Sequence, residues 1–172
     1  MRAMVRTSET WDGGPSTLPR MTSLRASGPG GDRHPCLGGR VPGIHHLELW
    51  VRDAGAAEPA WSWLLGRLGF VLDQVWPEGR SWSCGGAYLT LTESPNLSGD
   101  THDRRRPGLN HVAFHGGTPD DVDVLMVEAT EHGWTPLYAD RYPRAGGPAH
   151  YAGWLEDVDG FKVEVVASGG AR

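Results

Sequence analysis

Two histidines and a glutamate occupy related places in a sequence that repeats itself. His46 lies in the segment 43–49 and His111 in the segment 108–114, and both segments read glycine, apolar residue, polar residue, histidine, then an alternating run. Glu164 lies in the closing segment of the second repeat. Two imidazoles and one carboxylate are the ligands of 2-His-1-carboxylate sites, which hold a divalent metal and leave coordination positions open for substrate.

The alternation of side chains along three expected strands places these residues on the face of each strand that points away from the helix. Apolar side chains in each strand must face a helix, so their sequence neighbours point to the opposite face. This opposite face receives His46 and Glu48 from the first strand, His111 and His115 from the matching strand, and Glu164 from the last strand. A single histidine on a strand is more often structural, so alternation alone leaves a metal site and a structural role both open.

The elements that must position these residues form two copies of one unit. Strand alternation, helical spacing and helix-stopping glycines predict the order β-α-β-β-β twice. The expected elements are a strand at 44–52, a helix at 56–68 and strands at 70–76, 80–84 and 87–93, then a strand at 109–115, a helix from 119 to about 132, and strands at 134–139, 150–156 and 161–167. The predicted fold class is α+β, with two tandem βαβββ modules.

Composition divides the chain into a domain and two tails. Residues 1–42 are rich in Gly, Pro, Ser, Thr and Arg without strand or helix periodicity, which predicts a disordered tail. Residues 43–168 form the domain, and residues 169–172 form a short C-terminal tail. Within the domain we expect module one at 43–93, a polar linker at 94–107 and module two at 108–168.

Charge and hydropathy exclude several classes of function. The chain has a net charge of −5, and its acidic residues concentrate after residue 40. Such a domain is unsuited to a nucleic-acid backbone, which requires clustered basic residues. No apolar stretch approaches the roughly 18 residues that a membrane span needs. Two cysteines are too few for a disulfide framework, so we expect a cytoplasmic protein.

The segments that carry the two histidines and the closing glutamate resemble the vicinal oxygen chelate superfamily. This group includes glyoxalase I, extradiol dioxygenases and bleomycin-resistance proteins. The resemblance covers residues 42–168, and its most specific part is the closing turn and strand at 157–165. It implies a cup-shaped mixed sheet around a divalent metal (Fe, Mn, Zn or Ni), with His46, His111 and Glu164 as ligands.

The chain departs from two subgroups of that superfamily. The glyoxalase I pattern has a second glutamate in the fourth strand of module one, where the repeat places Thr90. The extradiol dioxygenase pattern has a tyrosine ten residues before the glutamate, where this chain has Trp154. The chain therefore keeps three ligands but lacks the marks of either subgroup.

Other residues are expected to contact the substrate. Glu48 and His115 are candidate bases for proton transfer, since they share the face of the ligands. The loop at 141–148 is long and rich in Gly and Pro, so it is expected to cover the site and to bring His150 or Tyr151 to the substrate. Three tryptophans are expected to line an aromatic pocket: Trp50, Trp82 and Trp154.

These features predict a metal-dependent enzyme that binds a small oxygenated metabolite through two adjacent oxygens, with dioxygenase-like or lyase/isomerase-like chemistry. The alternative is a metal-free protein of the same fold that sequesters a drug or metabolite, as bleomycin-resistance proteins do. Retention of all three ligands favours the enzyme. The resemblance also implies a homodimer, with the site within one subunit or between two.

Overall fold

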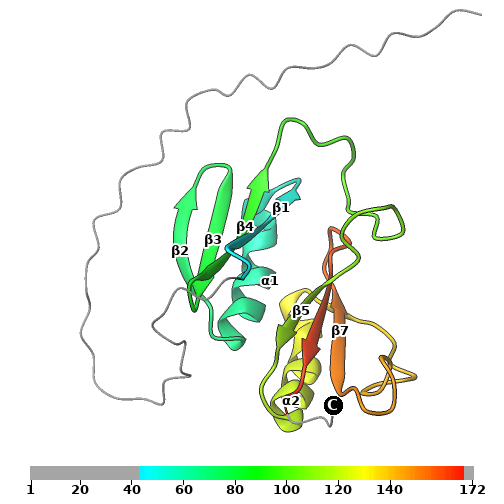
Figure 1. The fold of residues 1–172 in the computed structure, drawn as a ribbon. Coiled ribbons are helices and arrows are strands. Elements are labelled where there is room, and N and C mark those ends of the chain that lie inside the picture. The colour runs from blue at the N-terminus through cyan, green and yellow to red at the C-terminus, as the bar shows by residue number, and fades with distance from the viewer. Residues whose placement is uncertain (1–42, 169–172) are drawn as a thin grey trace, which may run out of the picture. The chain divides into compact units, whose positions relative to one another are not determined.

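The computed structural model describes residues 43–168 (Figure 1). The predicted tails at 1–42 and 169–172 lie outside the described residues. Module one consists of β1 (His46–Val51), α1 (Ala54–Arg67), β2 (Val71–Trp76), β3 (Gly79–Cys84) and β4 (Ala87–Glu93). Module two consists of β5 (Val112–His115), α2 (Pro119–Glu128), a 3₁₀ turn η1 (Ala129–His132), β6 (Thr135–Pro136), β7 (Ala152–Glu156) and β8 (Lys162–Val166).

Each module forms its own mixed sheet of four strands. The strand orders are β1-β4-β3-β2 and β5-β8-β7-β6, so the first and fourth strands of each module lie side by side. These pairs, β1 with β4 and β5 with β8, are parallel, and the remaining pairs are antiparallel. The predicted fold class of two βαβββ modules is confirmed.

Both helices begin at side-chain caps. The Asp53 carboxylate accepts a hydrogen bond from the Ala56 amide and so caps α1. The helix therefore begins at Ala54, two residues before the predicted start at residue 56. Thr118 and Asp121 form a reciprocal capping box at the start of α2, as expected for that Thr-Pro-Asp-Asp segment. These caps fix where each helix leaves its first strand, and hence which side chains that strand presents.

Module two departs from the predicted strand lengths on one side of its sheet. The strand expected at 134–139 is only two residues long, because Pro136 has no amide to donate and Tyr138 takes a left-handed backbone with φ of 59°. β7 begins at Ala152 rather than at residue 150. The chain between these strands is therefore a long loop, and its course decides what covers β8.

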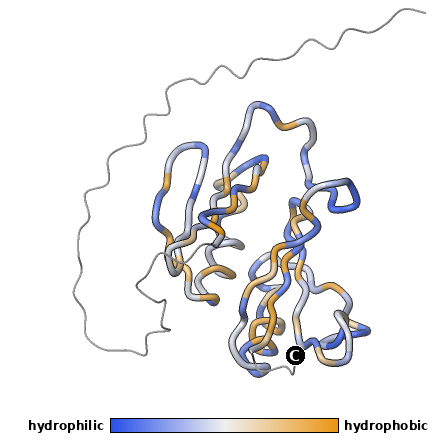
Figure 2. Tube along the Cα trace, viewed as in Figure 1, coloured by the Kyte–Doolittle hydropathy of each residue, from blue (hydrophilic) through white to orange (hydrophobic). Residues whose placement is uncertain are grey.

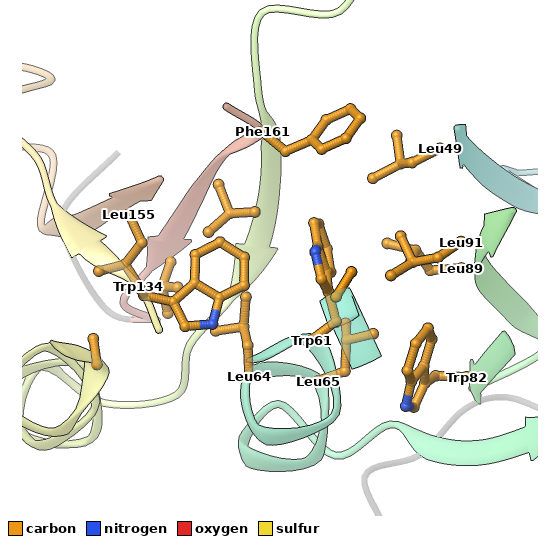
Figure 3. Packing of buried hydrophobic residues seen from close by; sticks show 14 of the residues in the cluster. Leu49, Trp61, Leu64, Leu65, Trp82, Leu89, Leu91, Trp134, Leu155 and Phe161 are labelled. Carbon is orange, nitrogen blue, oxygen red and sulfur yellow. The ribbon is translucent and has the colours of Figure 1, made fainter. Parts of the chain in front are cut away.

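The core joins the two modules through α1. The Trp61 side chain is fully buried, contacts the Trp134 ring edge-to-face, and lies with Leu64 and Leu65 among apolar residues of both sheets (Figure 3). Trp82 also belongs to this core, with 1% of its surface exposed. Its predicted place in a substrate pocket is therefore wrong, because it faces α1, where its indole donates to Ser62.

A buried carboxylate adds a polar contact between the modules. Asp157, in the turn before β8, accepts hydrogen bonds from Trp61 Nε1 at 2.9 Å and from the Phe161 amide at 2.8 Å. Burial is the main cause that raises the pKa of Asp157 to about 6, although both hydrogen bonds act in the opposite direction. The folded protein therefore keeps a proton that the unfolded chain releases near pH 4.

Replacing Asp157 with asparagine is expected to change how stability depends on pH. In the natural protein, the contribution of Asp157 to stability falls as pH rises from about 4 to 6, since this carboxyl ionises there only in the unfolded state. The free energy of unfolding of Asp157→Asn, relative to the natural protein, should therefore rise by on the order of 2–3 kcal/mol between pH 4 and pH 7. Urea unfolding at both pH values measures this difference. Asp140→Asn, at an exposed aspartate, is the control, and parallel pH profiles for all three proteins would refute the assignment.

The segment between β4 and β5 is hydrophilic over most of its length (Figure 2). It is anchored to module two at His102, whose ring stacks on Phe161 and whose amide donates to the Asp159 carbonyl. Among residues 43–168, neither helix has the length and apolar character required to cross a membrane.

Candidate functional site

Glu164 is the centre of a small cluster on the face of β8 that points away from the helix. Glu164 is 5% exposed, and its two carboxylate oxygens have different partners. His111 Nε2 lies 3.2 Å from Oε2, and His150 Nε2 donates a hydrogen bond to Oε1. The structure thus brings together two predicted ligands, His111 and Glu164, with one predicted substrate-contacting residue, His150.

Three segments position this cluster. His111 immediately precedes β5, and Asn110 Oδ1 lies 2.9 Å from its Nδ1, which orients the imidazole. Glu164 lies in the middle of β8, opposite Trp154 of β7. His150 comes from the long β6–β7 loop, which packs closely: a Cβ added at Gly146 would lie 2.4 Å from the His150 ring. The close approach at Gly146 fixes the His150 ring within this loop.

Trp154 forms one wall of the cluster. Its ring contacts that of His111 edge-to-face, with centroids 5.1 Å apart. Its indole N–H is the one buried side-chain polar atom among residues 43–168 that lacks a hydrogen-bond partner. Buried donors are nearly always satisfied in proteins, so this N–H is available to an acceptor that the chain itself does not provide.

His46 lies apart from this cluster. It is exposed on β1, its ring stacks on Tyr88 at 4.8 Å, and its Nδ1 lies 2.9 Å from that of His45. Among residues 43–168, no three histidine, cysteine, aspartate or glutamate side chains surround a common point as metal ligands would. One chain therefore holds together two of the three predicted ligands.

The strand register supports the repeat on which the ligand prediction depends. Glu48 of β1 pairs with Thr90 of β4, and Ala113 of β5 pairs with Glu164 of β8. Glu48 and Ala113 each follow their module's histidine by two residues, so Thr90 and Glu164 occupy equivalent positions. Module one therefore has a hydroxyl where module two has a carboxylate.

The other predicted substrate-contacting residues lie in separate places. Glu48 is exposed and accepts a hydrogen bond from Trp50 Nε1 at 3.0 Å. His115 is exposed at the end of β5. The Tyr151 hydroxyl donates to Asp123 on α2 at 2.7 Å, and this contact raises the pKa of Tyr151. Tyr151 therefore faces the helix side of β7, opposite to His150.

Pockets lie on two sides of these residues. A pocket of about 700 Å³ runs between β1 and the segment 97–109, and it includes Glu48 and Trp50 but none of the cluster around Glu164. A smaller pocket of about 240 Å³ lies beside Trp154 under the β6–β7 loop. Only the smaller pocket adjoins the cluster, through Trp154 and Gly146.

The cluster has the groups needed to exchange protons and to bind a cation. The carboxylate is held between two imidazoles, which can share a proton with it or present nitrogen and oxygen donors to a cation. Sequence reasoning found all three residues, but not the contact between His150 and Glu164. The signals for this contact in the sequence were the Gly-rich composition of the loop and the alternation of side chains along β8. Neither of them specifies where the loop folds back.

Comparisons with known proteins agree on one family. A sequence model of the glyoxalase/bleomycin resistance protein/dioxygenase superfamily matches residues 45–154. The uncharacterized protein YqjT of Bacillus subtilis (strain 168) is 43% identical over 126 residues, which are 72% of this chain and 98% of YqjT. A crystal structure of a protein provisionally assigned as a glyoxalase from Bacillus halodurans is 41% identical, with a TM-score of 0.69 over 73% of this chain and 95% of that one.

A more distant crystal structure shares the fold. The glyoxalase/bleomycin resistance protein from Albidiferax ferrireducens T118 is 19% identical, with a TM-score of 0.59 over 73% of this chain and 98% of that chain. At this identity the likeness concerns the fold alone.

Proposed function

Since the chain belongs to the glyoxalase/bleomycin resistance protein/dioxygenase superfamily, we propose that it is a metal-dependent enzyme acting on a small oxygenated metabolite. The observation that carries the proposal is the contact between His111 and Glu164, the two predicted ligands of module two, with Nε2 and Oε2 3.2 Å apart. Glu164 is buried, and a buried carboxylate needs compensating partners of this kind.

The donor set fits a divalent transition metal. Imidazole nitrogens with a carboxylate suit Fe, Mn, Zn or Ni, and three such ligands leave positions open for two substrate oxygens. His111 and Glu164 would hold the ion from module two, and Asn110 would orient the His111 ring. When bound, the ion would stabilise negative charge that develops on the substrate oxygens.

The remaining chemistry falls to residues of the chain. His150, whose Nε2 donates to Glu164, would accept a proton from the substrate and return it through its other ring nitrogen, Nδ1. The β6–β7 loop that carries His150 would limit the access of water to Glu164, which is 5% exposed. Trp154 forms an apolar wall with one free N–H donor.

We further propose that His46 of a second copy of the chain supplies the third ligand. Two observations support this: His46 is exposed on its strand, and it does not meet His111 and Glu164 within one chain. In a two-fold symmetric dimer, each subunit would give His46 to one site and His111 with Glu164 to the other.

Metal content tests the enzyme proposal directly. The protein, purified without chelator and then reconstituted, should hold close to one divalent ion per chain, and His111→Ala should lose it. His132→Ala is the matched control, because that imidazole stacks on Trp63 away from the cluster. No bound metal in the natural protein after reconstitution would contradict the proposal and favour the metal-free sequestering function.

Mixing two defective variants tests the shared site. His46→Ala and Glu164→Gln should each lose the metal, but random reassortment of the two into dimers should restore roughly one quarter of the sites. Those restored sites combine the intact His46 of one subunit with the intact Glu164 of the other. If His150 rather than His46 were the third ligand, His150→Ala would lose the metal, His46→Ala would keep it, and mixing would be without effect.

A further inference from the structure

The single lysine of the chain is buried beside the cluster. Every other basic residue is an arginine, whereas Lys162 is 7% exposed at the start of β8. Among residues 43–168 its ammonium group forms neither an ion pair nor a hydrogen bond with a side chain; Glu156, its cross-strand neighbour, pairs with Arg104 instead. A buried cation without a counter-charge is costly, so its retention calls for a partner.

Aromatic rings surround Lys162 but carry no compensating charge. Its Nζ lies 5.1 Å from the centroid of Trp154 and 5.9 Å from that of Tyr138. Cation–π contacts of this kind offset part of the cost of burial and leave the hydrogen-bond capacity of the ammonium unused.

The pocket of about 240 Å³ beside Trp154 is lined by these same groups. Arg141 also lines the pocket, with its guanidinium carbon 4.7 Å from the centroid of the Tyr138 ring. Among residues 43–168, the one carboxylate within 4 Å of the Arg141 guanidinium is that of the exposed Asp140, at 3.9 Å. Two cations therefore border one small pocket in a domain whose overall charge is negative.

Two of the residues that line this pocket have unusual features. Trp154, which lines it, has the unpartnered indole N–H described above. Tyr138 holds a left-handed backbone conformation, with φ of 59°, that non-glycine residues rarely adopt. Such strain persists where the surrounding structure imposes it, often at ligand sites.

From these observations we propose that the pocket of Tyr138, Arg141, Trp154 and Lys162 binds an anionic group, a carboxylate or a phosphate. An anion would supply the missing counter-charge of Lys162 and an acceptor for Trp154. The pocket is smaller than the roughly 300–1,000 Å³ of sites that take whole ligands, so it suits one group of a larger molecule.

This anion belongs to the substrate, a step that rests on the proposed function. The pocket shares Trp154 with the cluster around Glu164, and its Gly146 lies against His150. A small oxygenated metabolite with a carboxylate or phosphate would place that group on Lys162 and its reacting oxygens at His111 and Glu164.

Anion binding is tested with the full chain in the presence of a chelator, so that the outcome is independent of any metal. Calorimetric titration uses inorganic phosphate in one arm and lactate in the other, which distinguishes phosphate from carboxylate recognition. Binding in either arm is expected, and Lys162→Met should weaken it by at least about tenfold, the loss of one charge-assisted hydrogen bond. Arg144→Gln is the matched control, because Arg144 stacks on Tyr151 outside the pocket.

A second measurement uses the uniqueness of the lysine. Lys162 carries the only side-chain amine of the chain, so its acetylation by an amine reagent is read unambiguously by mass spectrometry. The anion that binds should slow this acetylation. Failure of both anions to bind and to protect Lys162 would overturn the proposal, as would Lys162→Met binding them like the natural protein; neither result would bear on the metal site.

Discussion

Replacing Glu164 with glutamine is expected to lower the affinity for a divalent metal by at least about 100-fold, since loss of even a residue that only supports a ligand costs 10–100-fold. The amide is nearly isosteric but has no charge to offer a cation. The amide also leaves one acceptor oxygen where the carboxylate had two, so His111 and His150 cannot both keep their contacts and the loop around His150 should become more accessible. Competition with a fluorescent chelator measures the affinity, and hydrogen exchange reports the loop.

Glu156→Gln is the control for this change. Glu156 precedes the final turn and pairs with Arg104 near the surface, so its loss removes an equal charge from the same sheet without touching the cluster. The assignment of Glu164 as a ligand fails if the two variants bind metal equally well. Retention of the far-ultraviolet circular dichroism spectrum in both variants excludes unfolding as the cause of any difference.

The second large effect is expected at Trp61. Trp61→Ala should lower the free energy of unfolding by about 3–5 kcal/mol, the usual range for truncating a buried aromatic side chain. The change opens a cavity between the two modules and leaves Asp157 without its indole donor. Because small domains are stable by only about 5–15 kcal/mol, such a variant would be close to unfolding at physiological temperature.

Two further variants separate the causes of this loss. Trp61→Phe keeps most of the packing but removes the hydrogen bond to Asp157, so its effect should be smaller. Trp63→Ala removes the same side chain from a half-buried position against His132 and should cost less than Trp61→Ala. Equal losses at positions 61 and 63 in chemical unfolding would contradict the central place of Trp61.

The sequence by itself determined the fold class and most elements. Side chains alternate with a period of two in 46–51 and 162–166, and a glycine follows the end of each helix. These patterns are local in the sequence, so they can be recognised without knowledge of the tertiary structure. The alternation of side chains along the strand also placed Glu164 on the face of β8 that points away from the helix, because this alternation is a property of the backbone. The strand expected at 134–139 was too long, since its pattern ignored the missing amide of Pro136.

Only the tertiary structure decided which of these side chains meet. Whether His150 folds back onto Glu164 depends on the course of the β6–β7 loop, and whether Trp82 faces a pocket or α1 depends on how its sheet packs. Contacts between residues distant in sequence arise from packing, which periodicity does not encode. For the same reason the sequence aligned His46 with His111 as equivalent residues, while the folded chain keeps His46 apart from Glu164.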